Sequence, residues 1–189
     1  MVDGDAARSA RARVGSARPD AVEEWLTERQ LDGGVDRVPL PTNVPGELRL
    51  CGKRAIADGR FAHPSMPWTT VVCLCRRHEL ADRYPAYVEW LEDKANNSVW
   101  WPMHDLGAAP VDATVPFVDG LVARLRAGER LLVHCAAGIG RAGTTAVCIL
   151  IRLGVPMEEA LSTVRTSRAL AGPEAGAQFE LVQAVAAAG

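Results

Sequence analysis

The sequence predicts an α/β fold, of the α+β kind, with one domain built around a central mixed sheet of four or five strands. Two patterns favour it. The sequence has more short apolar or alternating segments, typical of strands, than a single two-stranded hairpin would need. Longer segments with helical spacing alternate with these short ones. That alternation is typical of a sheet covered by helices on both sides. The length of 189 residues suits one domain plus a tail.

The beginning of the chain is predicted to be a disordered tail. Met1–Pro19 consists mainly of Ala, Arg, Gly and Ser and has almost nothing to bury. Residues 20–189 would then form the globular domain. Within it, Asp20–Leu31 is predicted to be a short helix with Asp20 as its N-cap, and a Gly-Gly pair follows it.

Several segments are predicted to be strands because they are short, apolar and bounded by turn residues. They are Val35–Leu40, Glu47–Cys51, Thr69–Cys75, Ser98–Pro102 and Arg130–His134. The third of these is apolar on both faces, which is typical of a central strand. Pro41–Gly46 would join the first two strands as a turn, and Ala55–Pro67 is expected to be irregular.

Other segments are predicted to be helices, with proline favoured in the first turn. They are Pro85–Ala95, Thr114–Ala127, Arg141–Leu153, a helix that Pro156 opens and a last helix that Pro173 opens. The last helix is predicted to turn Phe179, Val182 and Val185 inward. Met103–Val111, flanked by prolines, is expected to be a loop with little reason to be rigid.

The stretch with the clearest chemical meaning is His134–Thr144, HCAAGIGRAGT. Gly138 and Gly140 allow a tight turn that exposes backbone amides, and such amides with a helix start form a nest for an anion. Arg141 adds a planar fork of donors that can hold two phosphoryl oxygens. The same positive field is predicted to lower the pKa of Cys135 from ~8.5 and make it a thiolate nucleophile.

This stretch resembles the signature loop of the cysteine-dependent tyrosine and dual-specificity phosphatases, whose pattern is His-Cys, five residues, Arg, then Ser or Thr. The resemblance runs from about Val38 to the C-terminus. Its spacing is nearest to the compact dual-specificity group, which includes the cyclin-dependent-kinase-associated phosphatase. The resemblance implies a phosphotyrosine-phosphatase-like fold, with Cys135 as nucleophile, Arg141 as phosphate ligand and His134 as a supporting residue. The phosphate-binding loop would be Ala136, Ala137, Gly138, Ile139, Gly140 and Arg141.

Hydrolysis of a phosphate monoester also needs an acid that protonates the leaving oxygen. Asp105 is the candidate because it follows a strand and precedes Cys135 by 30 residues (135 − 105). The resemblance implies an acid at about this separation, and Trp101-Pro102 resembles the start of the tyrosine phosphatase acid loop. Asp112 is the alternative, but it is expected to be the N-cap of the next helix. His104 is a third candidate, although a loop histidine without a role is the commoner case.

The predicted function is hydrolysis of phosphate monoesters on proteins through a phosphocysteine intermediate, on phosphotyrosine first and phosphoserine or phosphothreonine second. The loop interior carries no Lys or Arg, which disfavours a polyphosphorylated inositol lipid. Ala142 stands where the family usually has a hydroxyl that helps the thiolate leave. The alternative is therefore a pseudophosphatase-like module that binds phosphoproteins with slow or no turnover. A sulfurtransferase or an arsenate reductase with a similar loop is a third hypothesis.

Composition limits the partners. The net charge of -2 gives no general attraction to nucleic acid or acidic lipid, and no apolar run approaches the ~18 residues of a membrane span. The cysteine count of 5 is odd, and no spacing is typical of a zinc site. We therefore expect a cytoplasmic monomer with a phosphoprotein or phosphopeptide substrate. No metal, other cofactor, nucleic acid or membrane partner is expected.

Several polar residues outside the loop have open interpretations. Gln178 is expected to face solvent, with a place near the attacking water as the alternative. Arg165 and Arg168 are expected to complement the negative end of their helix. Cys73 and Cys75 are expected to be buried apolar cysteines, with a disulfide to the nucleophile as the alternative.

Overall fold

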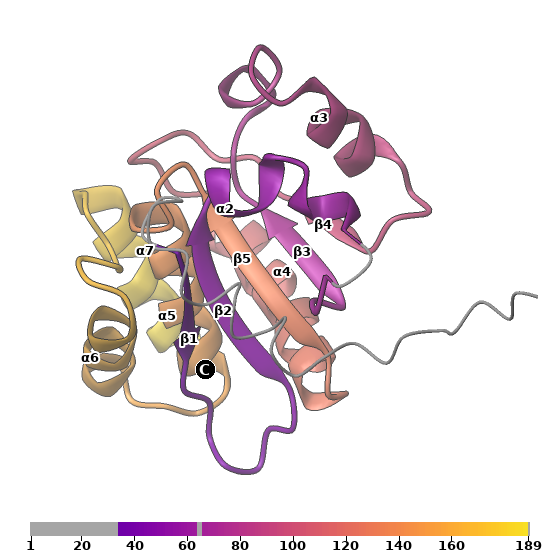
Figure 1. Cartoon of the computed structure of the whole chain (residues 1–189). Helices are drawn as coiled ribbons and strands as arrows, with labels where there is room; N and C mark the ends of the chain where they lie inside the picture. Colours follow the sequence, from indigo (N-terminus) through magenta and orange to yellow (C-terminus); the bar gives the residue numbers. More distant parts are fainter. Residues whose placement is uncertain (1–33, 64–65, 189) are drawn as a thin grey trace, which may run out of the picture.

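A computed structural model describes residues 34–63 and 66–188 of the chain. The predicted tail Met1–Pro19 and the predicted helix Asp20–Leu31 lie outside the described residues. The described chain folds around one five-stranded sheet with the strand order β1-β2-β5-β3-β4 (Figure 1). The predicted α/β fold with a central mixed sheet is confirmed.

The strands match the predicted segments, with ends that shift by no more than two residues. They are β1 (Val35–Val38), β2 (Glu47–Gly52), β3 (Thr70–Cys73), β4 (Ser98–Trp100) and β5 (Arg130–Cys135). β1 pairs antiparallel with β2, whereas the pairs β2–β5, β5–β3 and β3–β4 are all parallel. Because β5 is the middle strand, the loop that follows it lies at the centre of one end of the sheet.

The helices follow the predicted order, and several of their ends differ from the predicted ones. They are α2 (Arg54–Ala57), α3 (Pro85–Glu92), α4 (Val111–Arg126), α5 (Gly140–Arg152), α6 (Met157–Ser167) and α7 (Gly176–Ala187), with the 3-10 turns η1 (Arg60–Ala62) and η2 (Arg77–Glu79). The segment predicted to be irregular contains α2 and η1, and the last helix begins at Gly176 rather than Pro173. Among the described residues, none of these helices has the length and apolar character needed to cross a bilayer.

The sheet has a different helical layer on each face (Figure 1). Alternate side chains of a strand point to opposite faces. Leu131 and Val133 of β5 accordingly pack in the core cluster that includes residues of α4, α5, α6 and α7, whereas Leu132 packs with residues of α2 and α3. The same alternation puts Cys135 on the α5 side and His134 on the α3 side. Two neighbours in the sequence therefore face different surroundings.

The buried face of α7 differs in part from the predicted one. Val182 and Val185 are buried as predicted, but Phe179 is 44% exposed. Its neighbour Gln178 is 1% exposed instead. Each residue advances a helix by about 100°, so a helix that turns Gln178 inward must turn Phe179 toward solvent.

Candidate active site

The signature stretch forms a loop between a strand and a helix, as predicted. Cys135 is the last residue of β5, and Gly140 is the first residue of α5. Gly138, in the turn between them, has φ 76°, which favours glycine. A Cβ atom at this position would also lie 2.3 Å from the backbone oxygen of Cys51. Gly138 therefore lets the loop lie directly against the end of β2.

The loop carbonyls bond to groups outside the loop. Ala136 O accepts the N–H of Lys53 at 3.0 Å, and Ala137 O accepts Nη2 of Arg168 at 2.7 Å. The carbonyl of Ile139 accepts an N–H from the first turn of α5 at 2.8 Å. In a trans peptide the N–H points away from the C=O. The N–H groups that follow these carbonyls therefore face the inside of the loop, an arrangement that suits an anion.

Arg168 supports the loop in a way that the sequence did not predict. Instead of complementing the end of α6, its buried guanidinium forms an ion pair with Asp36 of β1 at 2.7 Å. It also donates to Gly34 O at 3.2 Å, besides its bond to the loop. The loop is thereby tied to the edge strand. No local pattern could reveal this contact, because the ion-pair partner is 132 residues away.

Cys135 lies at the base of the loop and is 3% exposed. Burial raises the pKa of its thiol above the ordinary value. The backbone amide of Ala142, the charge of Arg141 and the N–H of Gly138 all lower the pKa but do not offset burial. The Gly138 N–H donates to the sulfur at 3.3 Å. The lowered pKa that the sequence predicted is therefore wrong, because the motif indicates the donors but not the depth of burial.

Arg141 is buried, and its two terminal nitrogens are held by several acceptors. Its Nη1 and Nη2 donate to the two carboxylate oxygens of Glu79 at 2.7 and 2.8 Å, and Nη1 also donates to Met103 O at 3.0 Å. Its Nε has no hydrogen-bond partner among the described residues. An unsatisfied buried donor costs about 1–3 kcal/mol. The Nε of Arg141 is therefore a buried donor that remains available for a further acceptor.

Glu79 is a site residue that the sequence analysis missed. Burial alone would raise the pKa of its carboxyl, but hydrogen bonds from Arg141 and from the Arg76 backbone hold the pKa below its usual value. Glu79 is therefore ionised at neutral pH and forms a bidentate pair with Arg141, a strong and directional contact. It lies 62 residues before its partner. No motif spacing in the sequence indicated the pair.

Asp105 lies beside the proposed phosphate ligand. Its Oδ1 is 3.2 Å from Nη2 of Arg141, and its side chain is 71% exposed. The loop that carries it, residues 102–110, is called the acid loop here. Within this loop the N–H of Gly107 donates to His104 O at 3.0 Å, which closes a turn around Asp105. The structure thus brings a solvent-accessible carboxyl next to Arg141.

The other two candidate acids have different contacts. Asp112 lies in the first turn of α4, where its Oδ1 accepts the N–H of Ala113 at 2.9 Å. The N-cap of α4 is Pro110, so the prediction that Asp112 would be the cap is wrong. The fixed φ of proline suits a helix start, and α4 begins earlier than predicted. His104 is exposed and lies 2.8 Å from Arg76 through its Nδ1.

Gln178 connects the acid loop to α5 and α7. Its Nε2 donates to Gly107 O at 3.2 Å. Its Oε1 accepts the N–H of Glu174 at 2.8 Å and the hydroxyl of Thr144 at 3.4 Å. The expectation that Gln178 faces solvent is therefore wrong, since these bonds satisfy the buried amide. They also hold the middle of the acid loop, for which no rigid structure was predicted.

His134 lies behind the loop with two cysteines of β3 and its extension. One ligand atom from each of Cys73, Cys75 and His134 lies within 4.8 Å of the others, and all three residues are buried. A hydrogen bond with Cys73, helped by His134, lowers the pKa of Cys75 to about 5. Thiolate and imidazole are ligands that Zn²⁺ prefers, so these three residues could hold a metal ion. The sequence spacing did not indicate the group, because His134 comes from another strand.

His134 is also fixed by its other neighbours. Its Nε2 lies 2.7 Å from the hydroxyl of Tyr87, and its Nδ1 lies 3.4 Å from the carbonyl oxygen of Cys135. The Tyr87 and His134 rings are 5.7 Å apart. These contacts fix the His134 ring behind the loop, and the supporting role that the resemblance implies for it stays a prediction.

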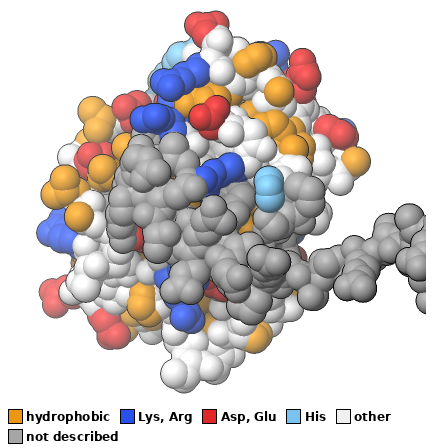
Figure 2. All heavy atoms as spheres, in the orientation of Figure 1, with side chains coloured by type: hydrophobic (Ala, Val, Ile, Leu, Met, Phe, Trp, Pro, Cys, Tyr) orange, Lys and Arg blue, Asp and Glu red, His pale blue; other side chains and the backbone are white. Residues whose placement is uncertain are grey.

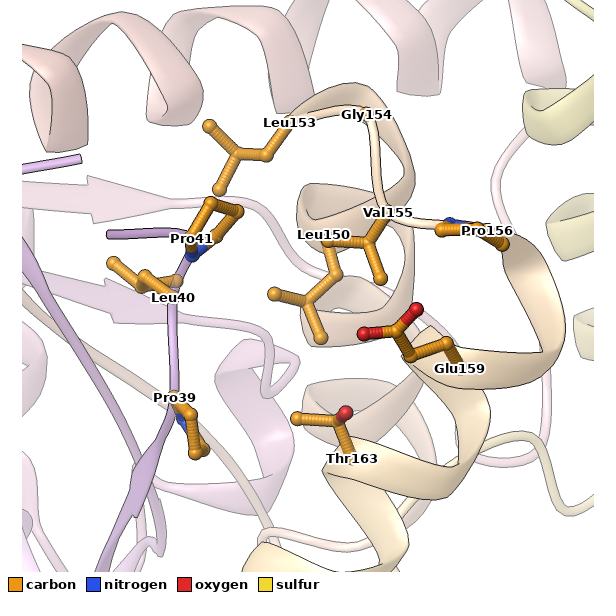
Figure 3. A pocket seen from close by; sticks show the side chains of 10 residues that line it. All are labelled: Pro39, Leu40, Pro41, Leu150, Leu153, Gly154, Val155, Pro156, Glu159 and Thr163. Atoms are coloured by element: carbon orange, nitrogen blue, oxygen red, sulfur yellow. The ribbon is translucent and has the colours of Figure 1, made fainter. Parts of the chain in front are cut away.

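One cavity of the molecule lies away from this loop. It has a volume of about 400 Å³ and lies between the segment after β1 and the end of α5 with the start of α6 (Figure 3). Its lining is mostly proline and aliphatic residues, and Glu159 and Thr163 supply its polar side chains. The lining of this cavity contains neither a cysteine nor a cation for phosphate chemistry.

Comparison with known proteins identifies the kind of domain. A family model described as "Swiss Army Knife protein, DSP-PTPase phosphatase domain" matches residues 44–183. No curated protein matches the chain by sequence. Among solved structures, a kinase associated phosphatase with its catalytic site cysteine replaced by serine aligns with a TM-score of 0.66 at 18% identity. That alignment covers 82% of this chain and 96% of the other.

Two further solved structures have a similar fold. Human DUSP28 aligns with a TM-score of 0.61 at 20% identity, over 82% of this chain and 93% of that one. Tk-PTP in its active form aligns with a TM-score of 0.61 at 22% identity, over 80% of this chain and 96% of that one. Together with the family match, these alignments show the fold of a compact dual-specificity phosphatase.

Proposed function

This chain belongs to the family of DSP-PTPase phosphatase domains of the Swiss Army Knife type, and on this premise we propose that it hydrolyses phosphate monoesters on proteins through a phosphocysteine intermediate. A phosphatase-type function follows from the family; the proposal adds the substrate and the mechanism. Phosphotyrosine is the first expected substrate, with phosphoserine and phosphothreonine second. We place this activity in residues 20–189. The observation that carries the proposal is the convergence of Cys135, the loop amides, Arg141 and Asp105 at one end of β5.

In the first proposed step, the Cys135 thiol loses its proton to solvent, and the resulting thiolate attacks phosphorus. The S–P bond forms as the bond to the leaving oxygen breaks, and Asp105 transfers its proton to that oxygen. The loop amides and the Nε of Arg141 would hold the remaining phosphoryl oxygens. Burial opposes ionisation of Cys135. The N–H groups of Gly138 and Ala142 favour the sulfur anion and offset part of that effect.

In the second proposed step, water attacks the phosphocysteine. The Asp105 carboxylate takes a proton from this water as the S–P bond breaks, and the Cys135 thiolate and inorganic phosphate are released. Asp105 then carries the proton for the next cycle, so the protons balance. Ala142 contributes its backbone amide to the departing sulfur but has no hydroxyl to add. This second step is therefore the one that we expect to be slow.

A substrate panel tests the proposed function directly. The panel compares phosphopeptides, inositol phosphates and nucleotides by release of inorganic phosphate. We expect the highest kcat/KM on a phosphotyrosine peptide. A preference for inositol phosphates or nucleotides would overturn the assignment to protein substrates, and no phosphate release from any of them would overturn the catalytic proposal itself.

Asp105→Asn is expected to lower kcat on a phosphotyrosine peptide by about 100-fold, while KM changes little. The carboxamide of asparagine is too weak an acid to protonate the leaving oxygen, and an unprotonated phenoxide leaves poorly. The loss should be smaller on p-nitrophenyl phosphate, whose leaving group is more acidic. Asp112→Asn is the matched control and should retain activity within about twofold, a margin typical of a surface change. Equal losses in the two variants would remove Asp105 from its proposed role.

Ala142→Ser is expected to raise the steady-state rate severalfold by adding a hydroxyl beside the departing sulfur. Rapid mixing with an aryl phosphate should show a burst followed by slow turnover in the natural chain, and the burst should keep its amplitude in the variant. Ala146→Ser, an equally buried position one turn further along α5, is the control for an added hydroxyl. A chain with no burst but with retained phosphopeptide affinity would instead be the binding module that the sequence left as the alternative.

A further inference from the structure

A polar cavity lies beside the proposed active site. It has a volume of about 590 Å³ and forms between η2 with its flanking residues and the start of the acid loop. Its charged and histidine side chains are Arg76, Arg77, His78, Asp82 and His104. Figure 2 shows Lys and Arg side chains grouped beside a histidine on the upper part of the surface, above the carboxyl end of the sheet.

Hydrogen bonds and chain neighbours connect this cavity to the proposed catalytic residues. Glu79, the last residue of η2, accepts the backbone N–H of Arg76 at 2.8 Å and also pairs with Arg141. On the other wall, His104 immediately precedes Asp105, which lies 3.2 Å from Arg141. The cavity therefore borders the phosphate site on the side where η2 meets the acid loop. A group attached near the reacting phosphate can reach it.

The charges in the cavity favour an anion. Asp82 is the single acid in the lining, and Arg77 pairs with Glu92 outside it. Arg76 Nη1 lies 2.8 Å from Nδ1 of His104, so the nearest polar partner of this guanidinium is an imidazole ring rather than a carboxylate. Within residues 34–63 and 66–188, Arg76 forms no ion pair. A phosphate or carboxylate is a stronger acceptor than imidazole, and we expect it to replace this contact.

We propose that this cavity is a specificity site for a second anionic group of the substrate, located a few residues from the phosphate that is hydrolysed. This inference rests on the proposed phosphatase function and deepens it. The second group would present an oxyanion, which Arg76 would bind. His78 and His104 would be further donors when protonated. Its source is either a second phosphorylated residue or an Asp or Glu side chain in the same peptide.

A peptide series tests the cavity and distinguishes the two sources. Phosphotyrosine peptides carry alanine, glutamate or phosphoserine at each of the three positions on either side of the phosphotyrosine. At the best position we expect kcat/KM to rise about tenfold with the second phosphate, which can make several charge-assisted bonds. The rise with glutamate should be about threefold, as for an exposed ion pair. The proposal would be overturned if neither glutamate nor phosphoserine raised kcat/KM at any of these positions.

Arg76→Gln examines the assigned residue while it keeps the backbone N–H that bonds to Glu79. The quantity to compare is the ratio of kcat/KM between the anionic and the alanine peptide, because the ratio cancels any general loss of activity. We expect the ratio to fall to about one in Arg76→Gln. Arg83→Gln, a nearby exposed arginine outside the lining, should keep the ratio. A ratio that survives in Arg76→Gln would overturn the assignment.

Binding separates this inference from the proposed function. The same peptides can be titrated against Cys135→Ser and against Cys135→Ser with Arg76→Gln by calorimetry. The first protein should bind the doubly anionic peptide about tenfold more tightly than the alanine peptide, and the second should lose that difference. If the natural chain hydrolyses nothing but this difference holds, the catalytic proposal fails and the cavity stands. If the doubly anionic and the alanine peptides are hydrolysed and bound equally well, the proposal for the cavity fails and the catalytic proposal stands.

Discussion

Cys135→Ser is expected to lower kcat by roughly 10⁴-fold or more, because a serine hydroxyl is far harder to ionise than a thiol. The substitution changes one atom at the base of the loop and leaves the amides and Arg141 in place. Phosphopeptide affinity should therefore remain or increase. Phosphate release under single-turnover conditions measures the rate of hydrolysis, and calorimetry measures the phosphopeptide affinity.

A second cysteine provides the control for this substitution. Cys148 is a buried residue further along α5, and Cys148→Ser adds a hydroxyl to the core without touching the sulfur at the loop. This variant should lose some thermal stability, about 1–3 kcal/mol for a poorly satisfied buried hydroxyl, and keep most of its kcat. Full activity in Cys135→Ser, or equal loss in both variants, would end the phosphocysteine proposal.

Arg141→Lys is expected to lower kcat/KM by about 10²–10³-fold even though the charge is kept. Lysine has neither the planar fork that Glu79 holds nor an Nε–H that can turn toward the loop. Affinity for inorganic phosphate should fall with kcat/KM, because lysine cannot replace the Nε–H that we propose as a phosphate donor. Calorimetry with phosphate and steady-state kinetics on one phosphopeptide provide the two measurements.

The same helix offers a matched control for that change. Arg152 of α5 also forms a bidentate ion pair, with Nε and Nη2 at 2.7 and 3.0 Å from the carboxylate oxygens of Asp119. Arg152→Lys therefore breaks a similar fork at the far end of the helix. It should leave kcat/KM within about twofold, as for a surface substitution. If both variants lose activity alike, the effect of Arg141→Lys is structural rather than a loss of phosphate contacts.

The features that the sequence predicted well are those encoded within a short segment. The apolar run before Cys135, the glycines of the loop and the apolar run after Arg141 define a strand, a turn and a helix locally, and the structure has all three. The order of strands and helices follows from periodicity in the same way. Their ends shift by a few residues because caps and tertiary contacts decide where an element stops.

The features that the sequence missed depend on contacts between distant segments. Glu79 and Arg168 meet the loop through partners 62 and 31 residues away, and neither belongs to a recognisable pattern. Gln178 is buried because three polar groups from different elements converge on its amide. Its burial in turn moves Phe179 to the surface. Such networks exist only once the helices are docked on the sheet.

The pKa of Cys135 illustrates the same limit in electrostatic terms. The motif correctly indicated amides and a guanidinium that favour a thiolate, and all of them act on the sulfur. The opposing contribution is burial, which depends on how α5 and the rest of the core cover the end of β5. A sequence lists the charges near a group but not the water that folding removes from it.

The outward bonds of the loop carbonyls have a thermodynamic consequence for affinity. Lys53, Arg168 and the start of α5 hold three peptide planes before any anion arrives. Fixing a flexible backbone costs about 1–2 kcal/mol per residue, and here folding of the whole domain has already met that cost. Phosphate should therefore bind with little loss of chain entropy, so its affinity reflects mainly how well the amides replace its hydration shell.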